Sequence, residues 1–352
     1  PTYDCGLIFI ESGSWIRMSS PTKIGEYLAA GLHIVGLEGI DVLERLEKNT
    51  HCVDTLTKNF EQQNLSKEKI YKIKEKINAL DRRGKSIKLA EGKPIVIPSN
   101  IQNDFKISAS EIEKNISEKT KLLLFSTPCN PSGSVYDESE LNEIADMLVK
   151  YPNIYIISDE IYELINFGTP HFSLASIDKI KERVITVNGV SKGFAMTGWR
   201  VGYIAAPKWI ADACTKIQGQ VTSATCSIAQ MATKTAMEAN PKKVKYMQEA
   251  FEERRDLMLS LLKEIPGIKT NIPKGAFYFF PDVSYYFGKK NNENVIENSN
   301  DLCMYLLNDA HVAVVSGSAF GTPECIRISY AASEENIKEA IRRIKKSLLK
   351  LI

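Results

Sequence analysis

The chain has 352 residues, enough for two domains and a sizeable hydrophobic core. Its 45 basic and 43 acidic side chains nearly cancel, which gives no indication of a nucleic-acid partner or an anionic membrane surface. The seven scattered cysteines contain no CxxC pair and the four histidines show no metal-ligand spacing, so the composition favours reduced thiols in a cytoplasmic protein. No apolar run approaches the length of a membrane span, and the N-terminus shows no signal-peptide pattern. We expect no metal, no nucleic acid and no membrane partner.

The first part of the chain predicts strand and helix in alternation. Residues 3–10 are strand-like, and residues 19–30 are typical of a helix whose small and hydroxyl residues at the start can bind a diphosphate. The run SSPTKIGEYLAAGLHIV resembles the C-terminal nucleotide-sugar domain of glycosyltransferases built from two Rossmann-like domains. This resemblance covers about residues 1–80 and implies a ribose contact for Glu26, whereas Met18 replaces the glutamate usual eight positions earlier. We therefore expect a partial Rossmann-like fragment rather than a working transferase.

A change in composition marks the end of this fragment. Lys, Glu, Asn and Gln dominate residues 58–85, and Ile70, Ile73 and Ile77 recur at helical spacing, which predicts one charged amphipathic helix. The run DRRGK that follows has no apolar pattern. We place a linker or junction at residues 81–86.

Three short apolar runs, about thirty residues apart and separated by helix-like segments, are typical of βαβ units. One polar group follows each run. Because open α/β sheets bind ligands at the carboxyl ends of their strands, we expect Asn130, Asp159 and Lys192 to lie together. The three runs are residues 121–125, 154–157 and 184–187.

These polar groups suit one particular cofactor. A lysine in a tight, partly apolar site becomes a nucleophile for carbonyl carbons, and Arg200, eight positions after Lys192, suits a phosphate. Lysine and arginine together are the minimal requirement for holding pyridoxal phosphate as an internal aldimine, although the pair alone also fits a surface lysine and a structural arginine. Asp159 can pair with a protonated pyridine nitrogen, and Asn130 and Tyr162 can hydrogen-bond the ring oxygen.

Several segments in order carry a resemblance to a known family. They are CNPSG, SDEIY, NGVSKGFAMTGWRVGY, GAFYFFPDV, GSAFG and CIRISYA. Over about residues 86–352 the chain resembles class I/II pyridoxal-phosphate aminotransferases, in the prokaryotic aspartate aminotransferase branch. The resemblance implies a fold-type-I α/β core, an open and mostly parallel sheet with helices on both faces. A truncated cofactor-binding large domain would span residues 87–240, and a long helix with a small α+β domain would span residues 241–352.

The resemblance also implies an activity, ping-pong transamination of an α-amino acid with a 2-oxo acid in a homodimer. Lys192 would form the aldimine and then carry the proton, Asp159 would keep the pyridinium protonated, and Tyr162 would hold the ring oxygen.

Binding roles follow from the same resemblance. Arg200 and Ser191 would bind the cofactor phosphate, with Gly189 as the alternative to Ser191. Arg327 would bind the substrate's α-carboxylate, beside Asn130. The sequence does not say which amino acid is the substrate.

One departure from the family pattern concerns the region before Ser86. Relatives carry about a quarter of their length there, including a glycine-containing phosphate loop and an aromatic ring stacked on the cofactor. The resemblance thus implies weak cofactor binding and impaired turnover. A non-catalytic or defective fusion chain, or a nucleotide-sugar binding fragment, stays open as the alternative.

Capping patterns predict three helices in the second part. Asp137 and Glu140 form a capping box for a helix through Val149. Asn240 with Pro241 starts a long helix to about residue 264. A last helix follows a serine cap at position 333, with acidic residues at its start and basic residues at its end.

Overall fold

The computed structural model describes residues 6–11, 14–17, 87, 92–168, 170–291 and 294–352. They belong to two compact units. Glu26, the helices predicted over residues 19–30 and 58–85, and the junction at residues 81–86 lie outside the described residues. The first unit comprises Pro1–Ile95, Gly189–Ser191 and Met196–Ala236, and the second comprises Val96–Asn188, Lys192–Ala195 and Met237–Ile352.

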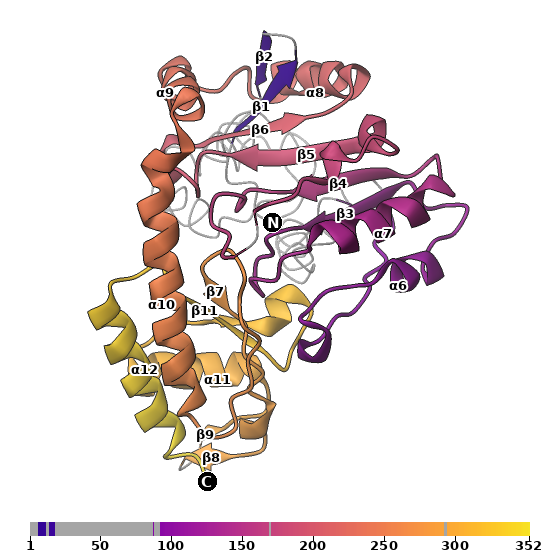
Figure 1. The fold of residues 1–352 in the computed structure, drawn as a ribbon. Helices are drawn as coiled ribbons and strands as arrows, with labels where there is room; N and C mark the ends of the chain where they lie inside the picture. The colour runs from indigo at the N-terminus through magenta and orange to yellow at the C-terminus, as the bar shows by residue number, and fades with distance from the viewer. Residues whose placement is uncertain (1–5, 12–13, 18–86, 88–91, 169, 292–293) are drawn as a thin grey trace, which may run out of the picture. The chain divides into compact units, whose positions relative to one another are not determined.

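Three parallel strands lie side by side in the second unit (Figure 1). They are β3 (Leu122–Ser126), β4 (Tyr155–Asp159) and β5 (Val184–Gly189). Their register pairs Ser126 with Asp159 and Asp159 with Val187, so the carboxyl ends of the strands lie at one edge. The three strands predicted from the apolar runs are therefore confirmed.

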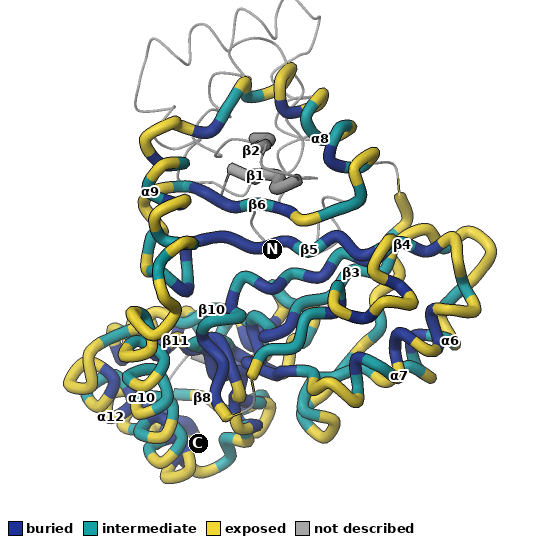
Figure 2. The backbone as a smooth tube through the Cα atoms, turned by 45° about the horizontal axis from the view of Figure 1, so that its top comes forward, coloured by how far each residue is buried: buried dark blue, intermediate teal, exposed yellow. Residues whose placement is uncertain are grey.

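Two helices, α6 (Ala109–Lys114) and α7 (Glu138–Val149), pack against these strands. Apolar side chains of α7 recur at helical spacing and pack with buried residues of β4 and β5. Other residues of the same helix are exposed (Figure 2). The buried set includes Leu141, Ile144 and Leu148 from α7, Ile156 from β4 and Val184 from β5.

The start of α7 confirms the predicted capping box. The Glu140 backbone N–H donates to Asp137 Oδ1 at 2.9 Å, and the Asp137 backbone N–H donates to Glu140 Oε2 at 2.8 Å. Glu140 also forms an ion pair with Lys106 at 2.6 Å. Two of the backbone donors at the helix start are thus satisfied reciprocally.

The C-terminal part of the second unit packs helices against a small antiparallel sheet with strand order β10-β11-β7. Its core also includes Tyr162, Ile165 and Phe167, which follow β4. The strands are β7 (Tyr278–Phe279), β10 (Val315–Ser316) and β11 (Ile326–Ser329), with a separate pair β8 (Lys290–Asn291) and β9 (Asn294–Val295). The helices are α10 (Lys245–Lys263), α11 (Ser299–Tyr305), the π-helix η8 (Leu306–Ala310) and α12 (Glu334–Leu348).

The predicted long helix differs at its start. Asn240 accepts a hydrogen bond from the Lys242 N–H at 2.9 Å, and Pro241–Val244 form a 3₁₀ turn before the α-helix begins at Lys245. The single helix predicted from Asn240 was therefore wrong over its first turn, because the cap and Pro241 also suit a tighter 3₁₀ turn.

Helix α12 follows its predicted cap at Ser333, which accepts from the Asn336 N–H. Isoleucines at positions 337, 341 and 344 are buried along one face. Shorter 3₁₀ segments are η2 (Ile101–Asn103), η3 (Leu174–Ser176), η4 (Lys181–Arg183), η5 (Thr197–Trp199), η7 (Ser284–Tyr286) and η9 (Gly317–Phe320).

In the first unit, β6 (Val201–Ala205) pairs in parallel with β1 (Gly6–Glu11), and β1 pairs antiparallel with β2 (Ser14–Arg17). Strand β1 overlaps the strand predicted over residues 3–10. Two helices follow, α8 (Lys208–Val221) and α9 (Ser227–Glu238). Within the described part of the chain, no helix is both long and apolar enough to cross a membrane.

The capping box gives a first prediction. Asp137→Ala removes the side-chain acceptor at the start of α7 and should lower the free energy of unfolding by about 1 kcal/mol, as measured by urea denaturation. Glu143→Ala, on an exposed position of the same helix, should change it by less than about 0.5 kcal/mol. Equal losses in both variants would contradict a specific capping role.

Candidate active site

Lys192 lies in the turn directly after β5. Its carbonyl accepts a hydrogen bond from the Ala195 N–H at 3.1 Å, which closes the turn. Gly193 packs on Leu164, because a Cβ added at position 193 would lie 2.8 Å from Leu164 Cδ1. The lysine side chain is half-buried, and its charge acts on the carboxyl of Asp159.

Asp159 is the last residue of β4 and has an unusual environment for a carboxylate. Burial raises its pKa to about 6, against the hydrogen bond that its Oδ1 accepts from the Ile161 N–H at 3.2 Å. Glu160 raises this pKa further, and Lys192 lowers it. Among the described residues Asp159 has no ion-pair partner, so a bound cation beside it would restore the charged form.

Tyr162 is buried in the turn that follows β4. Its hydroxyl lies 3.1 Å from the Tyr278 hydroxyl, and its ring meets the rings of Phe277 and Tyr278 edge-on. Burial raises the pKa of the phenol well above its usual value, and the neighbouring Tyr278 adds to the shift. The side chain is therefore a neutral phenol that can donate a hydrogen bond.

Asn130 and Arg327 are joined directly. Arg327 Nη1 donates to Asn130 Oδ1 at 2.8 Å. The guanidinium also lies over the rings of Tyr278 and Phe320, 4.5 and 4.9 Å from their centroids. These contacts orient a planar cationic fork that matches a carboxylate.

A chain of neighbouring groups links five predicted site residues of the second unit. Arg327 contacts Asn130 and Tyr278, and Tyr278 contacts Tyr162. The charges of Arg327 and Asp159 act on the Tyr162 phenol, and the charge of Lys192 acts on Asp159. The grouping is thus part of the structure, while the chemical roles stay predictions. The five residues are Asn130, Asp159, Tyr162, Lys192 and Arg327.

Ser191 and Arg200 belong to the first unit. Ser191 is buried. Arg200 follows η5 in the left-handed backbone region with φ of 57°, and its Nη1 donates to the Thr197 carbonyl at 2.7 Å. Their assignment to a phosphate stays a prediction.

A cluster that the sequence analysis missed lies beside Asp159. Ligand-type atoms of Glu160, Glu163 and His171 lie within 4.8 Å of one another. Glu160, however, already accepts hydrogen bonds from Ser158 Oγ at 2.8 Å and Ser173 Oγ at 3.0 Å, and its Oε2 lies 3.0 Å from His171 Nε2. We therefore interpret the cluster as structural. The only sign of this cluster in the sequence was the pair Glu160 and Glu163 within the SDEIYE run.

Comparison with known proteins agrees with this geometry. A sequence model of aminotransferase class I and II matches residues 84–344, more than half of the chain. The chain therefore belongs to the class I and II aminotransferase family.

The curated relatives carry aminotransferase names. The bifunctional aspartate aminotransferase and glutamate/aspartate-prephenate aminotransferase of Petunia hybrida is 45% identical over 267 residues, 74% of this chain and 56% of the relative. The aspartate aminotransferase of Pinus pinaster is 44% identical over 269 residues, 75% of this chain and 55% of the relative. The chain thus spans a little over half the length of these two plant relatives.

Solved structures show the same likeness. The aspartate aminotransferase of Rhizobium meliloti has a TM-score of 0.74 at 37% identity, over 78% of this chain and 69% of that one. The Thermus thermophilus aspartate aminotransferase with maleate has a TM-score of 0.68 at 34% identity, over 75% and 66%. These likenesses confirm the fold-type-I aminotransferase fold. The glycosyltransferase-like fragment and the domain boundaries stay predictions.

The raised pKa of Asp159 predicts a pH dependence. An aspartate in an unfolded chain has a pKa of about 3.9. Between pH ~4 and ~6 the unfolded state therefore loses the Asp159 proton while the folded state keeps it, so the free energy of unfolding falls as the pH rises. Asp159→Asn removes this loss. We therefore compare the free energy of unfolding of Asp159→Asn with that of the wild type, both without cofactor. The difference in favour of the variant should increase by on the order of 1–3 kcal/mol between pH 4 and pH 7.

Asp178→Asn is the control, because that carboxylate is exposed. A similar rise in this control, or none in Asp159→Asn, would contradict the assignment.

Proposed function

We propose that this chain catalyses pyridoxal-phosphate-dependent transamination of an α-amino acid with a 2-oxo acid. The observation that carries the proposal is the hydrogen-bonded pair Arg327–Asn130 and the pair Tyr162–Tyr278, together with the electrostatic influence of Lys192 on Asp159 and of Asp159 on Tyr162. The two plant relatives are named as aspartate aminotransferases, one of them also as a glutamate/aspartate-prephenate aminotransferase, which supports the same class of reaction here.

The donor set fits the cofactor. Asp159 is a carboxyl without an ion-pair partner among the described residues, and its pKa of about 6 suits a cationic ring nitrogen. The amide nitrogen of Asn130 makes no hydrogen bond to another described residue, so it can donate to the ring oxygen together with the neutral Tyr162 phenol. When bound, pyridoxal phosphate withdraws electrons from the amino acid's Cα.

Each side chain then has a definite task. The Lys192 amine would hold the cofactor's aldehyde carbon and, as a free amine, would take the proton from the substrate's Cα. Asp159 would stabilise the protonated ring nitrogen through its charge. Arg327 binds the α-carboxylate with its fork, since Asn130 and the two aromatic rings hold the guanidinium in place.

The remaining roles rest on the sequence resemblance. Arg200 would bind the cofactor phosphate with Ser191, or with Gly189 in its place. A homodimer and a cytoplasmic location belong to the proposal as well, and so does the expected weak binding of the cofactor.

A spectrum tests the cofactor assignment. Added pyridoxal phosphate should give the wild-type chain a protein-bound visible absorbance band, and Lys192→Ala should abolish it, because the amine proposed to bind the aldehyde is then gone. Lys181→Ala, at a surface lysine paired with Asp178, is the control and should keep the band. A wild-type chain without any band would refute the proposed function and favour the non-catalytic alternative.

Arg327→Lys tests the carboxylate site. Lysine keeps the charge but loses the fork, so affinity for L-aspartate or maleate should fall by about 10- to 100-fold, on the order of 1–3 kcal/mol, in a titration of the cofactor band. Cofactor affinity should stay unchanged. Arg342→Lys, at a surface arginine paired with Glu339, should change neither affinity. Parallel loss of both affinities in Arg327→Lys would make the arginine structural.

A further inference from the structure

Asn130 lies in a short turn, residues 129–134, which we call the Asn130 turn. Inside it the Cys129 N–H donates to the Ser134 carbonyl at 2.9 Å, and the Gly133 N–H donates to the Cys129 carbonyl at 2.8 Å. The carbonyls of Ser132 and Gly133 have no partner inside the turn, although both residues are buried. Buried carbonyls need donors from elsewhere in the protein.

The segment 271–275 supplies these donors. Asn271 Nδ2 donates to the Ser132 carbonyl at 3.1 Å, and the backbone N–H groups of Lys274 and Gly275 donate to the Gly133 carbonyl at 2.8 and 3.0 Å. The contact is close: Gly133 has φ of +69°, and a Cβ there would lie 2.5 Å from Pro273 Cβ. The segment 271–275 therefore packs directly on the Asn130 turn and leaves no room for a side chain at position 133.

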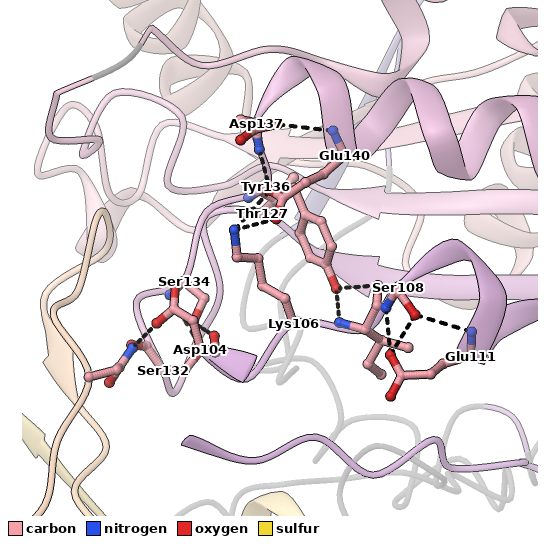
Figure 3. A network of polar contacts seen from close by, with 12 residues as sticks. Asp104, Lys106, Ser108, Glu111, Thr127, Ser132, Ser134, Tyr136, Asp137 and Glu140 are labelled. Atoms are coloured by element: carbon pink, nitrogen blue, oxygen red, sulfur yellow. Dashed lines mark hydrogen bonds and ion pairs between the residues drawn. The ribbon is translucent and has the colours of Figure 1, made fainter. Parts of the chain in front are cut away.

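Asp104 completes the contact from a third segment. Its Oδ1 accepts from Asn271 Nδ2 at 2.7 Å, and its carbonyl accepts from Ser134 Oγ, which also bonds Ser132 Oγ at 2.8 Å (Figure 3). The hydrogen bond to the carboxylate is charge-assisted. Asp104 and Phe105 both have positive φ, 56° and 54°, a conformation that costs free energy for residues with a Cβ. Such a backbone persists where surrounding contacts hold it.

Asn271 is the residue at which the three segments meet. One nitrogen bonds both Asp104 and Ser132, and the side chain's Oδ1 is buried without a partner among the described residues. The orientation of this amide is therefore set by its nitrogen alone.

We propose that Asn271 and Asp104 are positioning residues that fix the Asn130 turn, and that they act on substrate binding through Asn130 and its hydrogen bond to Arg327. The effect on substrate rests on the proposed function, whereas the effect on the turn does not. Neither residue would touch the reacting atoms.

The first test is hydrogen exchange of the full chain, read by mass spectrometry on peptides that cover residues 129–134. Asn271→Leu keeps the size of the side chain but removes both hydrogen bonds, so exchange in the turn should quicken by about tenfold. Tyr305→Phe is the matched control, since it also removes two hydrogen bonds, one donated to the Ser347 carbonyl and one accepted from Asn291 Nδ2, elsewhere in the same unit. It should leave the turn unchanged.

Asp104→Asn is the second variant if Asn271→Leu fails to fold, because asparagine tolerates positive φ and only the charge is lost. Exchange in the turn should still quicken relative to Tyr305→Phe. Unchanged exchange in both variants would overturn the proposal.

The second test uses maleate as the probe and pyridoxal phosphate as the reporter. Asn271→Leu should weaken maleate binding about 3- to 10-fold in the wild-type background but not in an Asn130→Ala background, because the two residues act in series. Equal weakening in both backgrounds would overturn the route through Asn130. A wild-type chain without a cofactor band, together with faster exchange in Asn271→Leu, would refute the proposed function and keep the positioning role.

Discussion

The hydrogen bond between Arg327 and Asn130 is the contact on which the rest of the site depends. It joins a strand of the C-terminal sheet to the turn after β3, across 197 residues of chain. The guanidinium also lies over two aromatic rings, and this cation–π packing holds its plane in a fixed orientation. A cation held this way recognises a carboxylate by shape as well as by charge.

The turn after β4 places two acidic groups in different surroundings. Asp159 ends the strand at the edge of the sheet, whereas Tyr162, three residues later, is part of the apolar C-terminal core. Burial raises both pKa values, to about 6 for Asp159 and well above the usual value for Tyr162, which therefore stays protonated. A single short turn thus supplies an ionisable carboxyl and a permanent hydrogen-bond donor.

Local patterns in the sequence predicted the structural features that depend on interactions between residues close together in the chain. The three strands, the capping box at Asp137 and the cap at Ser333 follow from apolar periodicity and from side-chain acceptors near helix starts. The rule that parallel strands end at one edge also predicted that Asn130, Asp159 and Lys192 lie together.

Contacts through space were not visible in the sequence. Asn271 and Asp104 are separated by 167 residues, and neither belongs to a periodic pattern. The Glu160–His171 contact likewise depends on how the chain returns after the turn. The 3₁₀ start before α10 was missed because an asparagine cap followed by proline suits both helix types.

The packing of Gly193 on Leu164 bears on how fast Lys192 can move. Leu164 occupies the space where a side chain at position 193 would lie, so the main chain beside the lysine cannot shift in that direction. Motion in that direction is left to the flexible stem of the lysine, and side-chain rotations take picoseconds to nanoseconds, whereas loop rearrangements take up to microseconds or longer. The travel of the amine between its positions would then be governed by a few torsions, and no loop opening would delay it.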